Sequence, residues 1–267
     1  MRQLNSLMDL SGRKALVTGG AGHIGFMTAQ TLIEQGADVT LLDLDEVACQ
    51  ESVAKLSRPE KTGLFAVPCD LTNEQATRTA VQKSISLMGG LDILVHCAAY
   101  VGTTEVAGWA VPFKEQTVDA WNAAMNVNLT SVFTMMQEGR EALASSGNGS
   151  VIFFGSIYGT VGNDMRLYEG TGLESPAAYP ASKGGIIQLA RYFATFFAPR
   201  IRVNTISPGG VWRDQTDDFH ERYIYRTPMR RMATEEDLKG AVAYLASDLS
   251  AYVTGHNLAV DGGWTAW

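Results

Sequence analysis

The sequence has little cysteine, little histidine and no excess of positive charge. Its three cysteines, Cys49, Cys69 and Cys97, show no Cys-x-x-Cys spacing, which argues against a disulfide framework or zinc site and favours reduced thiols. The four histidines, at positions 23, 96, 220 and 256, show no metal-ligand spacing, so we expect no metal. The net charge of −7 argues against nucleic acid as a partner, because phosphate binding needs a basic surface.

Long apolar runs are missing as well. No run reaches the roughly 20 residues that are needed to cross a bilayer, and residues 1–6 lack the apolar core of a signal peptide. We therefore expect a cytoplasmic protein without a membrane partner. The 267 residues, of which 46% are hydrophobic, suffice for one large core, and neither a linker nor an internal repeat is evident.

Short apolar runs alternate with segments of helical period. Strands are expected at 14–17, 39–42, 64–67, 93–95, 151–154, 201–206 and 258–260, and long helices at 23–35, 74–88, 118–144, 178–198 and 234–247. Apolar strands separated by helices predict a parallel sheet that is buried on both faces. We therefore expect one α/β domain over residues 1–267, a three-layer doubly wound (Rossmann) fold with a seven-stranded parallel sheet.

A glycine-rich turn joins the first expected strand to the first helix, and reads Thr18-Gly19-Gly20-Ala21-Gly22-His23-Ile24-Gly25. Glycines let the backbone turn tightly toward a pyrophosphate, and a helix N-terminus supplies free N–H groups. The strand-turn-helix setting therefore predicts a dinucleotide site, and its candidate binding residues are Gly19, Gly22, His23, Ile24 and Gly25. A glycine-rich turn in some other α/β fold is the alternative.

Asp43 at the end of the second expected strand bears on the choice of cofactor. It lies 18 residues after Gly25, where a carboxylate can accept hydrogen bonds from ribose hydroxyls and repel a 2′-phosphate. No Arg or Lys occurs between Asp38 and Gln50. These features favour NAD over NADP. A solvated loop acid is the alternative, and Asp45 is a less well-placed candidate.

Tyr179 and Lys183 open a long helical segment with the sequence Tyr179-Pro180-Ala181-Ser182-Lys183. Residues at i and i+4 share a helix face, and Pro180 fits only the first turn, so Tyr179 is expected at the helix entrance. A neighbouring ammonium favours phenolate and is expected to lower the pKa of Tyr179. The pair is therefore a candidate acid/base centre.

Several further segments follow one another in a fixed order. They are Cys69-Asp70-Leu71-Thr72, Gly89-Gly90-Leu91-Asp92-Ile93-Leu94-Val95, Val127-Asn128-Leu129, Val151 to Ser156, Ile201 to Gly209, and Val253-Thr254-Gly255 through Val260-Asp261-Gly262-Gly263-Trp264. With the glycine turn and Tyr179 to Lys183 included, the chain resembles the shorter branch of the short-chain dehydrogenase/reductase family over almost its whole length.

The resemblance implies a role for each matching residue. Tyr179 would be the general acid/base, Ser156 would orient the substrate oxygen, and Asn128 would anchor a water of the proton relay. Lys183 would hold the nicotinamide ribose and tune Tyr179. The remaining cofactor contacts would come from Asp70, Leu71, Ala98, Pro208, Gly209 and Val211. Helix or turn capping is the alternative for Ser156, Asn128 and Asp70.

The turn departs from the family pattern at His23, which stands where the middle glycine of TGxxxGxG is usual. The resulting TGxxGxxG spacing is similar to that of the extended branch, which contains sugar-nucleotide epimerases and dehydratases. His23 either flanks the pyrophosphate or simply begins the helix. After the fourth strand, His96-Cys97-Ala98-Ala99 replaces Asn-Asn-Ala-Gly; the backbone can still border adenosine, and His96 is expected to be structural.

The segment between Ser156 and Tyr179 is longer than the family usually has, which predicts an insertion at about 159–176. Tyr168 has a more usual distance from Ser156, but position 172 is glycine rather than lysine. Tyr179 therefore stays the catalytic candidate, and Tyr168 is either a decoy or a substrate contact. The polar and aromatic residues of the insertion suit a hydroxyl-rich or phosphorylated substrate; an oligomer contact or plain surface is the alternative.

A substrate lid is expected at about 210–232, with Trp212 and Arg213, and Tyr158 outside it, as candidate substrate contacts. A solvated pair of helices is the alternative. Three segments, Ser156-Ile157-Tyr158-Gly159, Tyr168-Glu169-Gly170 and Ser207-Pro208-Gly209-Gly210, resemble the flagellin modification protein A type. That narrower resemblance implies a sugar or amino-sugar derivative as substrate.

Three functions remain open from the sequence. The first is an NAD(H)-dependent oxidoreductase that acts on a secondary alcohol or ketone of a sugar-derived substrate. The second is a sugar-nucleotide epimerase or dehydratase that retains NAD; the turn spacing favours it and the short C-terminus opposes it. The third is a non-catalytic NAD-binding sensor, which the intact Ser156, Tyr179 and Lys183 set opposes. The family resemblance also implies a homotetramer or homodimer.

Overall fold

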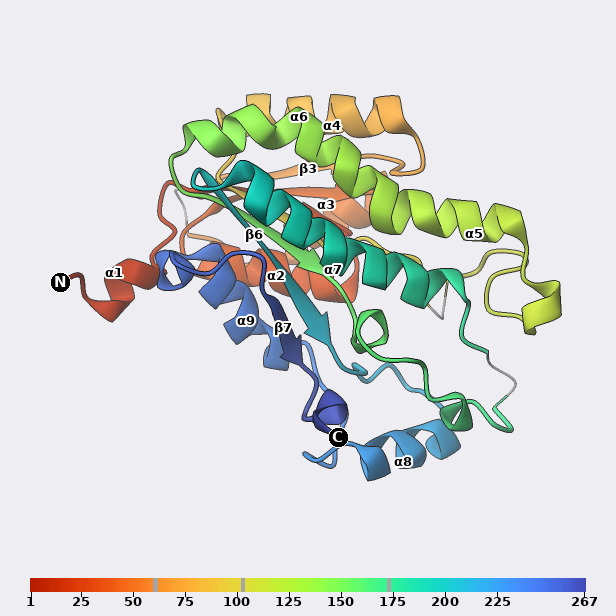
Figure 1. The fold of residues 1–267 in the computed structure, drawn as a ribbon. Coiled ribbons are helices and arrows are strands. Elements are labelled where there is room, and N and C mark those ends of the chain that lie inside the picture. Colours follow the sequence, from red (N-terminus) through yellow and green to blue (C-terminus); the bar gives the residue numbers. More distant parts are fainter. Residues whose placement is uncertain (60–61, 102–103, 172–173) are drawn as a thin grey trace.

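Seven parallel strands form one sheet in the order β3-β2-β1-β4-β5-β6-β7 (Figure 1). The computed structural model describes residues 1–59, 62–101, 104–171 and 174–267. The strands are β1 (Lys14–Thr18), β2 (Asp38–Asp43), β3 (Leu64–Pro68), β4 (Ile93–His96), β5 (Gly149–Phe154), β6 (Ile201–Pro208) and β7 (Asn257–Val260). Each lies within two residues of its predicted bounds, and the expected seven-stranded parallel sheet is confirmed.

Nine α-helices are found in the described ranges. They are α1 (Leu4–Met8), α2 (His23–Glu34), α3 (Glu46–Lys55), α4 (Glu74–Met88), α5 (Val118–Met125), α6 (Ser131–Ser145), α7 (Ala178–Phe197), α8 (Asp217–Arg226) and α9 (Glu236–Ala246). Short 3₁₀ turns are η1 (Phe113–Glu115), η3 (Ile157–Gly159), η4 (Met165–Leu167), η5 (Asp248–Ser250) and η6 (Trp264–Ala266).

The single helix expected over 118–144 is a correction to the sequence prediction. A π-helical segment, η2 (Asn126–Thr130), separates α5 from α6. Hydrophobic periodicity did not reveal it, because the apolar pattern continues through the segment. Such π turns are frequent at functional sites.

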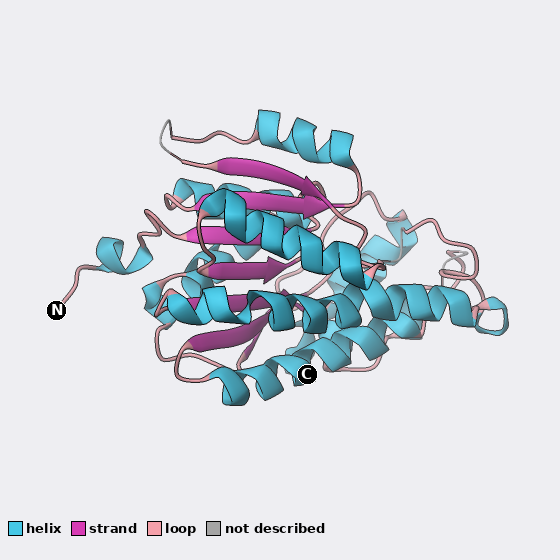
Figure 2. Cartoon of the chain, turned by 90° about the horizontal axis from the view of Figure 1, so that it is seen from above, coloured by secondary structure: helices cyan, strands magenta, loops and turns pink. Residues whose placement is uncertain are grey.

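Helices lie on both sides of the sheet (Figure 2). Two apolar clusters fill the spaces between the sheet and these helices. On one face, Leu32 of α2 and Leu245 of α9 pack with the apolar side chains of β1, β2 and β4 to β6. On the other face, α4, α6 and α7 cover the sheet, with Val81, Met135 and Ile186 fully buried. This arrangement is the expected three-layer, doubly wound architecture.

The strand order places a crevice at the carboxyl ends of β1 and β4. The chain proceeds outward from β1 through β2 to β3, and then returns to the other side of β1 with β4. The loops that follow these two strands leave in opposite directions, and ligands of open parallel sheets bind in the gap between them. Within the described ranges, no helix is long and apolar enough to cross a membrane, and no group of three or more His, Cys, Asp or Glu side chains is arranged for a metal ion.

Candidate active site

The glycine turn after β1 leaves no room for a side chain at Gly19 or Gly25. A Cβ atom on Gly25 would lie 2.0 Å from the carbonyl oxygen of Gly19. Gly19 itself has a φ of +65°, and a Cβ there would lie 2.8 Å from the backbone nitrogen of Ala98. Gly22 forms the N-cap of α2 without a side-chain cap. The first-turn N–H groups of α2 can therefore receive an anion, and the turn fits a dinucleotide pyrophosphate.

The carboxylate of Asp43 is fixed beside this turn. Its Oδ2 accepts a hydrogen bond from the backbone N–H of Ala21 at 2.9 Å, and its Oδ1 accepts one from Leu44 at 2.7 Å. Asp45 instead caps α3 through the N–H groups of Val47 and Ala48. The geometry therefore favours Asp43 over Asp45 as the acid that faces an adenosine ribose.

Asp70 and Leu71 follow β3 at the same edge of the sheet. Asp70 Oδ1 accepts hydrogen bonds from the N–H and the hydroxyl of Thr72, so this exposed acid stabilises its own turn. Leu71 is buried in the core beneath it. The expected contact of Asp70 with adenine stays a prediction, and its capping role is observed.

His96 is a structural residue at the end of β4. Its Nδ1 lies 2.9 Å from the hydroxyl of Thr18, which also accepts a hydrogen bond from the N–H of Ala98 at 3.2 Å. The ring is fully buried, and burial lowers the pKa of His96 to about 3, so the ring is neutral at neutral pH. The hydrogen bonds among His96, Thr18 and Ala98 hold the loop after β4 against the glycine turn. The backbone of Ala98 therefore lies at the crevice.

Ser156, Tyr179 and Lys183 meet where β5 ends and α7 begins. Ser156 follows β5, and its hydroxyl is close enough to the phenol of Tyr179 to lower the pKa of that phenol. Tyr179 is the second residue of α7, so Pro180 falls in the first turn as expected. The buried Lys183 donates from Nζ to the carbonyl of Phe154 at 2.7 Å, and this Nζ lies 5.8 Å from the centre of the Tyr179 ring. The predicted catalytic trio is thus brought together.

The expected direction of the Tyr179 pKa is wrong for this structure. Burial raises the pKa of Tyr179 and outweighs the hydrogen bond from Ser156, which lowers it. Burial also lowers the pKa of Lys183 to about 8. The ammonium is therefore only weakly held in its charged form, and its Nζ is engaged by a backbone carbonyl. Proximity in sequence predicted the pairing, whereas burial decides the pKa values.

Asn128 lies in η2 and braces the start of α7. Its Oδ1 accepts a hydrogen bond from the N–H of Tyr100 at 2.7 Å, and its Nδ2 donates to the hydroxyl of Ser182 at 3.0 Å. Ser182 in turn donates to the carbonyl of Tyr179 at 2.9 Å. Asn128 therefore holds the turn that carries Tyr179, and its water-anchoring role stays a prediction. Ser182 lies between Tyr179 and Lys183 in the sequence, but no sequence pattern predicted its hydrogen bond with Asn128.

The cofactor candidates Pro208, Gly209 and Val211 follow β6 at the same edge. Gly209 N–H donates to the carbonyl of Val260 at 3.0 Å, which binds this loop to the last strand. Val211 forms an isolated parallel bridge with Ala233. The segment therefore has a fixed backbone beside the crevice, and its contact with the nicotinamide stays a prediction.

Aromatic side chains stand above the catalytic trio. Tyr158 and Tyr168 influence each other's pKa, and burial, the largest cause, raises the pKa of both. Tyr168 also packs edge-on against Phe219 of α8, with ring centres 5.5 Å apart. Trp212 packs in the same way against His220, at 4.5 Å. These rings are candidate walls of a substrate site.

The predicted insertion is tied to the predicted lid. Arg226 of α8 pairs with Asp164 at 2.6 Å, and Arg222 donates to the carbonyls of Arg166 and Glu169. The guanidinium of Arg226 also lies 4.7 Å from the centre of the Trp264 ring. These contacts hold the insertion against α8, and its role at a substrate site stays a prediction. Its positions 172–173 lie outside the described residues.

Comparison with known proteins supports the fold and identifies the family. A family model described as enoyl-(acyl carrier protein) reductase matches residues 19–265. Sorbose reductase sou1 of Schizosaccharomyces pombe is 30% identical over 98% of this chain and 99% of its own length. A short-chain dehydrogenase of Leptospira borgpetersenii, solved with bound NAD+, is 34% identical with a TM-score of 0.83, covering 99% of this chain and 96% of that one.

A structure described as a Pseudomonas aeruginosa RhlG/NADP active-site complex is 31% identical with a TM-score of 0.80, and covers 97% of this chain and 98% of that chain. Structures similar to this chain therefore include complexes with NAD+ and with NADP, so a nicotinamide cofactor is supported without a choice between the two. The family model, the yeast relative and the two solved structures all match nearly the whole length of this chain. The chain belongs to the short-chain dehydrogenase/reductase family of oxidoreductases.

Proposed function

We infer that this protein is an NAD(H)-dependent oxidoreductase that interconverts a secondary alcohol and a ketone on a polar, sugar-derived substrate. The observation that carries this inference is the meeting of Ser156, Tyr179 and the buried Lys183 where β5 ends and α7 begins. A non-catalytic binding protein would not need a hydroxyl pair that is aimed at a reacting oxygen.

The residues divide the chemistry among them. Ser156 hydrogen-bonds the substrate oxygen and fixes its distance from Tyr179. Tyr179 donates its proton to that oxygen during reduction and takes it back during oxidation. Its raised pKa keeps the phenol protonated, which suits the reductive direction. The nicotinamide, when bound, supplies or accepts the hydride. Lys183 would reach the nicotinamide ribose and place a positive charge beside Tyr179.

NAD is the proposed cofactor because the Asp43 carboxylate is held at the turn by Ala21. A 2′-phosphate at that position would meet a negative charge. Binding of NADH and NADPH can be compared by nucleotide fluorescence, and we expect NADH to bind at least about tenfold more tightly. The variant Asp43→Ser should reduce that preference, whereas Asp45→Ser, which removes a nearby carboxylate but keeps an N-cap hydroxyl on α3, should leave it unchanged. Equal binding of both cofactors by the native protein would refute this choice.

Polar atoms of the insertion, of the lid and of the neighbouring Tyr158 support a polar, sugar-derived substrate. Besides the hydroxyls of Tyr158 and Tyr168, two buried polar atoms, Asn163 Oδ1 and His220 Nδ1, have no hydrogen-bond partner within the described residues. A hydroxyl-rich ligand would satisfy such atoms. The name of the yeast relative, a sorbose reductase, agrees with this class. The narrower flagellin modification protein A assignment rests on the sequence segments alone and stays part of the proposal.

The test is formation or consumption of NADH by the purified protein with sugars, polyols, amino sugars, sugar acids and their phosphate or nucleotide derivatives. Turnover with one class, lost in Tyr179→Phe, would support the proposal and identify the substrate. If nucleotide binds but only substrate isomers or dehydrated products form, without net NADH, the epimerase or dehydratase alternative holds. Nucleotide binding without any product would favour a sensor.

Self-association is part of the proposal. Phe133 on α6 and Tyr192 and Phe196 on α7 expose 48, 54 and 60% of their surface, which is unusual for aromatic side chains. A second copy of the chain would cover them. Light scattering after size exclusion should give the mass of a dimer or tetramer, and a monomer at micromolar concentration would contradict this expectation.

A further inference from the structure

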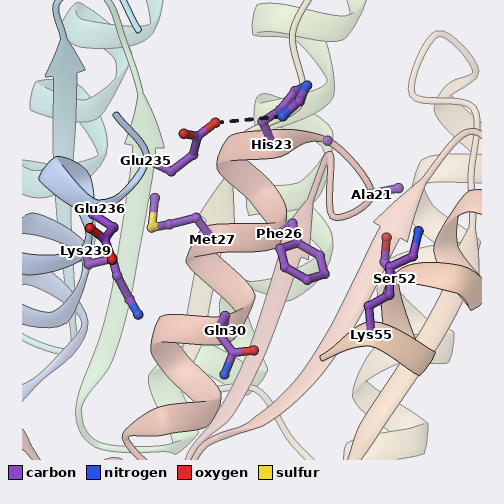
Figure 3. A pocket seen from close by; sticks show the side chains of 11 residues that line it. Ala21, His23, Phe26, Met27, Gln30, Ser52, Lys55, Glu235, Glu236 and Lys239 are labelled. Carbon is purple, nitrogen blue, oxygen red and sulfur yellow. Dashed lines mark ion pairs between the residues drawn. The ribbon is translucent and has the colours of Figure 1, made fainter. Parts of the chain in front are cut away.

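The side chains of His23, Arg213 and Glu235, which are distant in the sequence, converge beside the glycine turn. Arg213 Nη1 lies 2.7 Å from Glu235 Oε1, and His23 Nδ1 lies 3.7 Å from the same oxygen. Figure 3 shows His23 at the top of α2 with the Glu235 carboxylate directed toward it. The acid thus stands between the turn that would receive a pyrophosphate and the arginine that follows β6.

The backbone holds Arg213 and Glu235 in this position. Trp212 N–H donates to the carbonyl of Ala233 at 2.9 Å, and Ala233 N–H donates to the carbonyl of Gly210 at 2.9 Å. Arg213 N–H also donates to Gln215 Oε1 at 2.8 Å. These bonds join the segment after β6 to the segment before α9, so the backbone positions from which both side chains extend are fixed relative to each other.

The guanidinium of Arg213 has N–H donors that can bind a further anion. Its side chain is 25% exposed and that of Glu235 is 34% exposed, so the pair is partly screened from water. Among the described residues, its ion pair with Glu235 and its hydrogen bond to the carbonyl of Trp212 both use Nη1. An arginine offers five N–H donors in a planar fork that matches phosphate oxygens.

A carboxylate at this place opposes the binding that the turn is built for. A hollow of about 450 Å³ along α2 is lined by Gly22, His23 and Glu235, so the acid lies next to the α2 N-terminus. A pyrophosphate carries two negative charges and would be repelled by a free carboxylate. The arginine can neutralise either anion, and the phosphate offers more oxygens to its donors.

We propose that Arg213 is a ligand of the dinucleotide pyrophosphate. In the ligand-free protein Glu235 pairs with the guanidinium of Arg213, and on binding the phosphates replace the Glu235 carboxylate as the partner of Arg213. The proposal rests on the proposed dinucleotide cofactor. It assigns Arg213 to the cofactor rather than to the substrate. It also gives Glu235, which the sequence did not single out, a defined role as the competing anion.

The test is equilibrium binding of NADH, followed by fluorescence, and of ADP-ribose, followed by calorimetry. ADP-ribose keeps the pyrophosphate and lacks the nicotinamide. We expect Arg213→Gln to weaken both ligands by about tenfold or more, the worth of a charge-assisted hydrogen bond. Glu235→Gln should tighten both by a few fold, since it removes a negative charge beside the phosphates.

Matched controls come from the same region. Arg231 pairs with Asp237 at 2.6 Å, so Arg231→Gln breaks a similar ion pair away from the turn and should change neither affinity. Glu236 lines the same hollow, and Glu236→Gln should have a smaller effect than Glu235→Gln. Arg213→Lys, which keeps the charge without the fork, should fall between the native protein and Arg213→Gln and serves if the glutamine variant fails to fold.

The outcomes separate the possible failures. If Arg213→Gln weakens NADH but not ADP-ribose, the arginine acts at the nicotinamide or the lid and the proposal is wrong. If Glu235→Gln weakens binding, the acid positions Arg213 instead of competing for it, and its role as the competing anion is wrong. If the native protein binds neither ligand, the proposed cofactor itself fails, and the inference fails with it.

Discussion

Replacing the buried Lys183 by methionine should stabilise the ligand-free protein while abolishing its activity. Lys183 is 3% exposed, and burial holds its pKa at about 8 instead of 10.5. Below that pKa the native state must carry a charge in an apolar surrounding, whereas the unfolded chain solvates it freely. The buried Lys183 therefore lowers the stability of the folded protein at neutral pH.

The magnitude follows from the two pKa values. One pKa unit corresponds to about 1.4 kcal/mol, so the protonated lysine lowers the free energy of unfolding by about 3 kcal/mol at pH 7. As pH rises from 8 to 10.5, the native state has lost the proton that the unfolded state still binds, so stability increases with pH. At pH 10 the remaining cost is about 1 kcal/mol. Loss of the hydrogen bond to Phe154 offsets about 1–2 kcal/mol at every pH.

Urea denaturation of the ligand-free protein at several pH values measures this directly. We expect Lys183→Met to be more stable than the native protein by about 1–2 kcal/mol at pH 7, and the difference to shrink by about 2 kcal/mol on going to pH 10. Lys83→Met, at an exposed position of α4, should track the native protein throughout. A difference that stays constant with pH would refute the reasoning, because packing or hydrogen bonding alone would then explain it.

Three further changes have clear expected outcomes. Tyr179→Phe should lower turnover by about 10²–10⁴-fold without changing NADH affinity; activity near the native level would show that another group moves the proton. Gly25→Ala places a Cβ 2.0 Å from a carbonyl oxygen of the turn and should abolish NADH binding in a fluorescence titration, whereas Gly162→Ala, with open space around its Cβ, should not. Asp164→Asn removes the ion pair to Arg226 and should raise the substrate KM several-fold with little effect on NADH binding; an unchanged KM would mean that the insertion does not hold the lid.

Much of the fold could be predicted because its determinants are local. Each strand is a short apolar run, and the sheet's parallel order follows from the helices between those runs. The glycine turn could be placed for the same reason, since the tight approach of Gly25 to Gly19 is a property of neighbouring residues. The i, i+4 spacing of Tyr179 and Lys183 also gave their common helix face.

The missed or mistaken features all depend on contacts between distant segments. The π turn at Asn128 is braced by Tyr100 and Ser182, and neither contact has a periodic pattern. The direction of the Tyr179 pKa was wrong because burial is a property of the packed chain rather than of the spacing to a lysine.

The sequence by itself determined the sheet, the glycine turn and the shared helix face of Tyr179 and Lys183, because each is encoded within a few adjacent residues. Only the tertiary structure decided how these parts are held and charged. It tied the insertion to α8 through Asp164 and Arg226, and set Glu235 between His23 and Arg213. Electrostatic energies depend on the distances between charges and on their burial. In this chain of 267 residues, both are set only when segments that are distant in the sequence pack together.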